Sequence, residues 1–299
     1  MAEKYLHKSV LLEECIDFLR LSPGKVIVDA TIGGAGHAEE ILKRILPGGR
    51  LIGLDKDLES LELAKNKLTS FKESVELIHT DFKNLKSVLE DLKTGGVDGI
   101  LFDLGISSIQ METKERGFSI KNNGPLDMRM DRTQRLTAKD IINDFSESEL
   151  SNLIKDFGEE RFHNRIARAI VSARRAKEVE TTFELVDIIL KAIPYKNRSS
   201  RIHPATRTFQ AIRIRVNDEL SAIERALKDA LLALKKGGRI CVVSFHSLED
   251  RIAKITFREF ASKGVIRSLT KKPVIPQEDE ISKNPRSRSA KLRIAERLA

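Results

Sequence analysis

Residues 25–55 predict a strand–helix–strand unit in which each strand ends in an aspartate. The run from Lys25 to Asp29 is short and apolar, as a buried parallel strand requires. An amphipathic stretch from Ala38 to Leu46 follows, and a second apolar run then leads to Asp55. Between the first strand and the helix lie three glycines within four positions, Gly33, Gly34 and Gly36. Glycines in such a turn permit a tight backbone and the close approach of a ligand.

The position of Asp55 indicates what kind of ligand this is. An acidic residue about 20 positions after a glycine-rich turn is placed to hold both hydroxyls of a ribose. We therefore predict that the chain binds a nucleoside-type cofactor.

The glycine spacing argues against a dinucleotide. Pyrophosphate binding uses the pattern G-x-G-x-x-G, but here Glu39 occupies the place of the third glycine, and Asp29 precedes the turn. Two extra carboxylates near a helix N-terminus repel a diphosphate. They suit a ligand that carries an ammonium and a sulfonium, namely S-adenosylmethionine. A dinucleotide and a purely structural turn remain as alternatives at this point.

Two further strands end in the same way. Residues 75–79 predict a third strand that runs into Asp81 and Phe82, and residues 97–103 predict a fourth that ends at Asp103. The carboxyl ends of neighbouring parallel strands share one crevice. Phe82 is therefore placed to lie against an adenine, and Asp81 either accepts from its amino group or caps a helix.

Composition limits the class of protein. The 299 residues allow one large or two ordinary domains. No apolar run reaches the length of a membrane span, and the N-terminus lacks the layout of a signal peptide. Only Cys15 and Cys241 are present, both in apolar surroundings, and no His/Cys cluster has zinc spacing. We expect a cytoplasmic protein with neither membrane nor metal, and its oligomeric state is left open.

The positive charge is concentrated in part of the chain. The formal net charge is +9, and residues 161–215 alone contain 13 Lys/Arg against 4 Asp/Glu. Arg161, Arg165 and Arg168 recur at helical spacing, and residues 283–297 add six basic residues against one acid. Such runs are usually solvated faces, but this concentration favours a polyanionic partner.

The alternation of strands and helices stops after Gly105 and resumes near residue 208. The intervening stretch is loop-like and then helical. A long helix is predicted for residues 208–234, a fifth strand for 239–243, and a pair of edge strands after Gly264. We predict one doubly wound, cofactor-binding domain of residues 1–106 and 208–299, interrupted by a helical substrate-recognition domain of residues 107–207.

Six segments carry a resemblance to a known family: His7–Leu11, Asp29–His37, Asp103–Ser108, Gly124–Asp131, Ser244–Arg251 and Asn284–Arg293. They are similar to those of the MraW/RsmH family of bacterial 16S ribosomal RNA (cytosine-N4) methyltransferases, in order and over nearly the whole chain. One departure is Ser9, where the family usually has proline. The resemblance implies an α/β fold of the Rossmann-like class I methyltransferase type, doubly wound and mostly parallel with an antiparallel C-terminal strand.

The resemblance also implies the site residues. Its cofactor contacts fall on Ala35, Gly36, His37, Asp55, Phe82, Asp103 and Gln110. Gln110 is implied by the resemblance alone, because the residue pattern there is that of an ordinary loop. The implied cofactor is S-adenosyl-L-methionine, and the implied substrate is a cytidine in the decoding region of 16S RNA within the small ribosomal subunit.

The chemistry can be argued separately. Methylation of pyrimidine carbon-5 needs a cysteine nucleophile near the fourth strand, and none lies between Cys15 and Cys241. Transfer to an exocyclic amine needs only in-line placement and a proton acceptor. Asp103 and the residues after it offer an acid and carbonyls but no aromatic ring, so His246 or Phe245 is the candidate for holding the base. His246 is the candidate catalytic residue, with a helix cap as the alternative. A non-catalytic RNA-binding assembly factor and a dinucleotide enzyme with a helical lid are the competing functions.

Overall fold

The chain divides into two units that are interleaved in the sequence. The computed structural model describes residues 9–198 and 202–298. One unit comprises Met1–Gly105 and Leu220–Ala299, and the other comprises Ile106–Glu219. The second boundary lies beyond the position expected from the sequence, and each unit is described by itself below.

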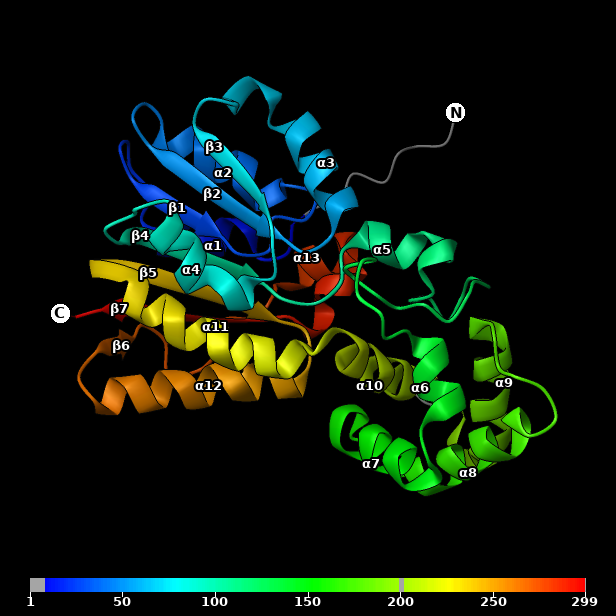
Figure 1. The fold of residues 1–299 in the computed structure, drawn as a ribbon. Coiled ribbons are helices and arrows are strands. Elements are labelled where there is room, and N and C mark those ends of the chain that lie inside the picture. The colour runs from blue at the N-terminus through cyan, green and yellow to red at the C-terminus, as the bar shows by residue number, and fades with distance from the viewer. Residues whose placement is uncertain (1–8, 199–201, 299) are drawn as a thin grey trace. The chain divides into compact units, whose positions relative to one another are not determined.

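The first unit is built on a seven-stranded sheet with the order β3-β2-β1-β4-β5-β7-β6 (Figure 1). The strands are β1 (Val26–Asp29), β2 (Arg50–Asp55), β3 (Val75–His79), β4 (Val97–Asp103), β5 (Leu234–Ser244), β6 (Ile266–Ser268) and β7 (Lys291–Arg297). β1 to β5 are parallel, whereas β7 pairs antiparallel with both β5 and β6. This confirms the predicted mostly parallel sheet with an antiparallel C-terminal strand.

Helices cover both faces of the sheet, as in a doubly wound fold. α1 (Leu12–Leu19), α2 (Gly36–Ile45) and α3 (Leu58–Lys67) bury their apolar sides in one core cluster. α4 (Leu85–Asp91), α11 (Glu219–Ala233) and α12 (Ser247–Ser262) contribute to the other. A short helix, α13 (Glu278–Lys283), lies in the segment before β7. Alternate residues of β1 enter opposite cores, Ile27 one and Val28 the other, which explains its continuous apolar run.

The second unit has its own helical core. Its α-helices are α5 (Ser108–Glu112), α6 (Ala138–Asp144), α7 (Glu147–Gly158), α8 (His163–Arg174), α9 (Thr182–Ala192) and α10 (Thr206–Asn217). Capping boxes begin α6, α7 and α9, at Thr137, Ser146 and Thr181. The apolar sides of these helices form one separate cluster of buried residues. Within the described residues, no helix of either unit is both long and apolar enough to cross a bilayer.

The prediction of a single helix for residues 208–234 is wrong. The chain forms α10 and α11 instead, separated at Asp218, whose backbone is left-handed with φ of 49°. The cause is the bonding of buried Asn217, the last residue of α10. Its side chain donates to the Met128 carbonyl at 2.8 Å and accepts from Met130 N at 2.7 Å. The helix therefore ends at the position where that amide is held.

Candidate functional site

Three aspartates end three adjacent strands of the sheet. Asp29, Asp55 and Asp103 are the last residues of β1, β2 and β4, and β1 lies between the other two. In the registers of the two pairings, Asp29 stands opposite Gly53 of β2 and Leu101 of β4. The sequence prediction that these carboxylates meet at one edge of the sheet is therefore confirmed.

The turn between β1 and α2 brings its backbone to Asp55. Gly33 and Ala35 both have left-handed backbones, with φ of 48° and 57°. This geometry lets Gly33 N donate to Asp55 Oδ2 at 2.9 Å. A Cβ built on Gly34 would meet no atom within 4 Å, so the turn has open space at that residue.

Gly36 has a different reason for being glycine. A Cβ at this position would overlap the side-chain hydroxyl of Ser9. Ser9 is itself buried, and it is the first described residue of the motif His7–Leu11; His7 and Lys8 lie outside the described residues. The glycine therefore makes room for the N-terminal segment, a packing role that the spacing argument did not anticipate.

The carboxylate of Asp55 is fixed by backbone donors on both sides. Its Oδ1 accepts from Asp57 N at 2.9 Å, and its Oδ2 accepts the bond from Gly33. Each carboxylate oxygen has a second lone pair. Burial raises the pKa of Asp55 to about 6 in spite of these two bonds. The side chain is thus oriented as an acceptor for further donors, as a ribose clamp requires.

Asp103 is the most electrostatically unusual residue of the site. Burial, with the nearby charges of Asp29 and Glu249, raises its pKa to about 8. Its Oδ1 is buried and has no hydrogen-bond partner among residues 9–198 and 202–298. Its Oδ2 lies 3.6 Å from Nδ1 of His37, and the other ring nitrogen of His37 contacts the Val10 carbonyl at 3.2 Å.

Asp29 and Thr31 join the strand ends together. Thr31 N donates to Asp29 Oδ1 at 3.1 Å, and Asp103 N donates to Thr31 Oγ1 at 2.7 Å. Burial raises the pKa of Asp29 to about 7, and the charge of Asp55 adds to the effect. Neither residue was among the predicted cofactor contacts, although Asp29 was noted as an acid before the turn.

These observations fit a cationic nucleoside ligand. None of the three aspartates has a lysine or arginine ion-pair partner within the described part of the chain. A buried carboxylate without a counter-charge is costly, and a positive ligand relieves that cost. S-adenosylmethionine has an ammonium, a sulfonium and a ribose, which match the buried acids, the oriented Asp55 and the open space at Gly34.

Phe82 follows β3, one position after Asp81. Asp81 caps the 3₁₀ turn Phe82–Asn84 by accepting from Lys83 N at 3.0 Å, so the capping alternative for this residue is confirmed. The Phe82 ring packs edge-on against Phe102, with centroids 5.8 Å apart. Because Phe102 immediately precedes Asp103, the aromatic ring is anchored beside the end of β4.

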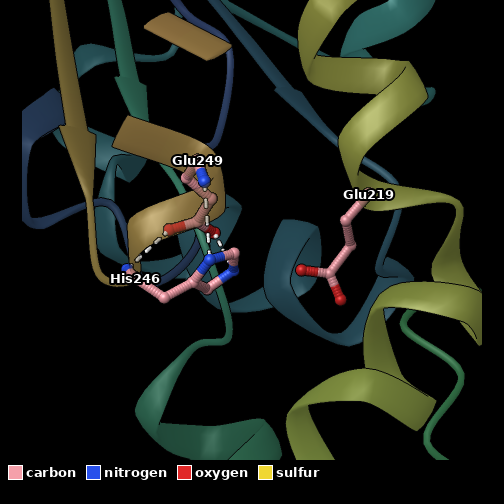
Figure 2. Close-up of side chains that lie close together, drawn as sticks. All are labelled: Glu219, His246 and Glu249. Atoms are coloured by element: carbon pink, nitrogen blue, oxygen red, sulfur yellow. Dashed lines mark hydrogen bonds and ion pairs between the residues drawn. The ribbon is translucent and has the colours of Figure 1, made fainter. Parts of the chain in front are cut away.

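His246 follows the end of β5, and Figure 2 shows its ring folded against the Glu249 side chain. Its Nδ1 accepts from Glu249 N at 3.4 Å, and its Nε2 lies 3.2 Å from Glu249 Oε1. The fully buried Glu249 also accepts from Phe245 N at 2.7 Å. His246 thus caps α12, and the ring is held by its own helix. Glu219, also labelled in Figure 2, belongs to the second unit, where Arg213 binds its carboxylate at 2.8 Å.

Comparison with known proteins places the chain in a family. The sequence model of the MraW methylase family matches residues 4–298 of this chain. The chain belongs to the MraW methylase family. It is 46% identical to the ribosomal RNA small subunit methyltransferase H of Clostridioides difficile, over 99% of this chain and all of that one. It is 50% identical to the protein of the same name from Sulfurihydrogenibium sp., over 98% of this chain and 99% of that one.

Membership of the MraW methylase family confirms the predicted family, the class of enzyme and the cofactor S-adenosyl-L-methionine. The individual contacts remain predictions, and for Gln110 the structure adds a local role. Gln110 belongs to the second unit of this MraW methylase, where its Oε1 accepts from Ser107 N at 3.0 Å in the capping box of α5. Its side chain is buried.

Two residues of this MraW methylase were not predicted from the sequence: Thr31, which links the ends of β1 and β4, and Glu249, which holds the ring of His246. The signal for Thr31 was its place two residues after the end of β1, where Asx-type turns form. The signal for Glu249 was its spacing of three from His246, as in a capping box.

Proposed function

We propose that this protein methylates the N4 exocyclic amine of a cytidine in the decoding region of 16S ribosomal RNA, using S-adenosyl-L-methionine. The transfer is direct and in line, without a covalent enzyme intermediate. The observation that carries the proposal is the group of three aspartates at the strand ends, with Asp29 buried and Asp55 and Asp103 partly buried, around the open turn at Gly34. This group calls for a cationic nucleoside cofactor. The relatives' name supplies the class of RNA.

Each residue of the site then has a distinct task. The bound cofactor supplies an electrophilic methyl group on its sulfonium. Asp55 accepts hydrogen bonds from the ribose hydroxyls, because Gly33 and Asp57 already orient its oxygens. Phe82 covers the adenine, and Asp103 faces the positive charge with its unpartnered Oδ1.

The cysteines support direct transfer. The sequence contains two, Cys15 on α1 and Cys241 on β5, and both are buried free thiols. Cys241 Sγ contacts the Cys15 carbonyl at 3.8 Å, so residues far apart in the sequence lie side by side. The hydrogen bond with Cys241 and burial hold the pKa of Cys15 well above its usual value. A thiol that stays protonated is not a nucleophile for pyrimidine carbon-5.

Transfer to an amine needs the nitrogen held in line with the methyl carbon. Bound S-adenosylmethionine would supply the methyl group and keep the electron pair of the broken carbon–sulfur bond as S-adenosylhomocysteine, and the proton lost by the amine would pass to water. We assign the carbonyls after Asp103 to hold the amine, and His246 to contact the base from the end of β5. The cap formed by His246 fixes the orientation of its ring for that task.

The second unit supplies the RNA-binding surface in this proposal. Arg161, Arg165 and Arg168 are exposed, with the last two on α8 and Arg161 just before it. Arg161 stacks on Phe162 with 4.5 Å between the guanidinium carbon and the ring centroid, and Arg168 lies 3.5 Å from Glu147. Phosphate contacts from such side chains supply salt-dependent, sequence-independent affinity. The cytoplasm, where ribosomes assemble, is the proposed location.

Tritiated methyl transfer tests the proposal. We expect labelling of assembled or late-stage small subunits to exceed that of deproteinised 16S RNA, because two separated basic segments span more surface than one hairpin offers. Nucleoside analysis should place the methyl on the exocyclic amine of cytidine. Asp55→Ala is the matched variant with low cofactor affinity, and excess cofactor should restore its methyl transfer. A methyl on carbon-5 or on a ribose hydroxyl would overturn the chemistry, and binding without transfer would favour an assembly factor.

A further inference from the structure

Tyr195 is the most exposed large hydrophobic side chain in the described parts of the chain, at 84%. It follows α9 in the second unit, between Pro194 and Lys196. Nothing in the cofactor site or in the basic face of α8 uses it. An aromatic ring left this open in a folded unit is unusual, because burying it would be favourable.

The ring is presented by an ordered turn. Asn197 N donates to the Pro194 carbonyl at 2.8 Å, and Arg198 N donates to the Tyr195 carbonyl at 3.0 Å, which closes a single 3₁₀ turn. The turn follows α9 directly, whose end is fixed by the bond from Ile193 N to the Ile189 carbonyl at 3.1 Å. The backbone under the ring is therefore bonded, and the exposure of Tyr195 is a property of a defined conformation.

Arg198 is held against the same ring. Its Nε donates to the Ile193 carbonyl at 3.0 Å, and its guanidinium carbon lies 5.7 Å from the Tyr195 centroid. This is a cation–π distance. With 84% of the side chain accessible, the guanidinium covers only a small part of the ring. The pair thus offers a flat aromatic surface beside a fixed positive charge.

The surroundings favour an anionic partner with flat rings. Lys191 and Lys196 flank the turn and are exposed, and the sequence from 161 to 215 has 13 basic residues against 4 acidic ones. Unpaired nucleic-acid bases stack on tyrosine rings and guanidinium planes, and the neighbouring phosphates need positive charge. A neutral apolar partner would not need these charges.

We propose that Tyr195 and Arg198 of the second unit form a stacking platform for an unpaired base of the RNA substrate. The platform rests on the proposed function, because it presupposes an RNA substrate. It contributes affinity by stacking, whereas the arginines of the α8 face contribute it through phosphates. The two contributions should therefore differ in their dependence on salt.

The composition of the chain allows a direct optical test. It has no tryptophan, and its only tyrosines are Tyr5 and Tyr195, so in Tyr5→Phe all tyrosine emission comes from Tyr195. Small-subunit RNA fragments with unpaired loops should quench this emission after correction for RNA absorbance. Fully paired duplexes of the same length should quench it much less.

Substitutions separate stacking from charge. Tyr195→Ala should weaken RNA binding about 5- to 100-fold with the salt slope unchanged, and Tyr195→Phe should bind as the parent does. Phe183→Ala is the matched control, because Phe183 is also exposed in this unit, at 44%, but no arginine of residues 9–198 or 202–298 lies over its ring. Affinity for S-adenosylhomocysteine should stay unchanged in all of them.

The outcomes distinguish failure of the stacking platform from failure of the proposed function. If Tyr195→Ala binds and is methylation-competent like the parent, and RNA does not quench Tyr195, the platform is refuted and the function stands. If quenching requires ribosomal proteins, the partner is a protein and the platform is also refuted. If the parent protein neither binds nor methylates the RNA, the proposed function fails and the platform fails with it.

Discussion

Cofactor affinity should rise with pH up to about pH 8 and then level off. Asp103 has a pKa of about 8 and Asp29 one of about 7, mainly because both are buried. At lower pH both hold protons, and a protonated carboxyl has no charge with which to attract a cation. A positively charged ligand stabilises the ionised forms, so binding must expel the proton.

The magnitude follows from the pKa of the group that must ionise. If binding requires Asp103 in its charged form, apparent affinity falls about tenfold per pH unit below its pKa, which gives up to about 100-fold between pH 9 and pH 6. The groups that face Asp103 are His37, Asp29 and Glu249.

Isothermal titration calorimetry measures both consequences. Titrations of S-adenosylmethionine in buffers with different ionisation enthalpies should show about one proton released per binding event near pH 7. Asp103→Asn removes the titrating group and should flatten the pH profile, which also controls for titration of the ligand itself. S-adenosylhomocysteine, which lacks the sulfonium charge, should show a smaller dependence. Equal pH profiles for the parent and Asp103→Asn would refute the reasoning.

Three further predictions concern the site and the second unit. Asp55→Ala should weaken S-adenosylmethionine binding about 10- to 100-fold, because charged-group hydrogen bonds of roughly 1.5–3 kcal/mol are lost; unchanged calorimetric affinity in a folded variant would refute the ribose clamp. Replacing Arg161, Arg165 and Arg168 by glutamine should leave cofactor affinity intact and lower the salt slope of RNA binding by roughly one unit per lost phosphate contact; an unchanged slope would assign the RNA contacts to residues 283–297. Asp103→Asn should stabilise the cofactor-free protein by roughly 1–3 kcal/mol at pH 8 and hardly at all near pH 4, because a raised carboxyl pKa makes stability fall as pH rises from about 4 through 8; denaturant unfolding at the two pH values checks the sign.

The strands of the first unit could be predicted because their signal is local. β1, β2 and β4 are apolar on both faces, so each appears as a continuous run that ends at an aspartate. Their common edge follows from the rule for parallel strands. The packing of Gly36 against Ser9 could not be predicted in this way, because it joins segments 27 positions apart.

The break at Asp218 illustrates the limit of periodicity. Residues 208–234 contain no proline, and no glycine occurs among them to mark an interruption. The helix ends because the Asn217 amide bonds to backbone groups at Met128 and Met130, nearly ninety residues earlier. Local propensity favours continuation there, and tertiary hydrogen bonding overrides it. The helical pattern of residues 208–234 contains no information on where Met128 and Met130 lie in the fold.

In the first unit, some carboxyl side chains are bound by an arginine, whereas the aspartates of the candidate site are not. Asp250 on α12 is held by Arg293 at 2.7 Å, and Glu296 on β7 is held by Arg239 at 2.8 Å. The pKa of each of these carboxyls is lowered, although burial opposes the shift. Asp103, at the end of β4, instead keeps a raised pKa and an unpartnered oxygen. Because the same fold pairs Asp250 and Glu296 with arginine, we infer that the carboxyls at the strand ends, which have no such partner, meet their positive charge when the cofactor binds.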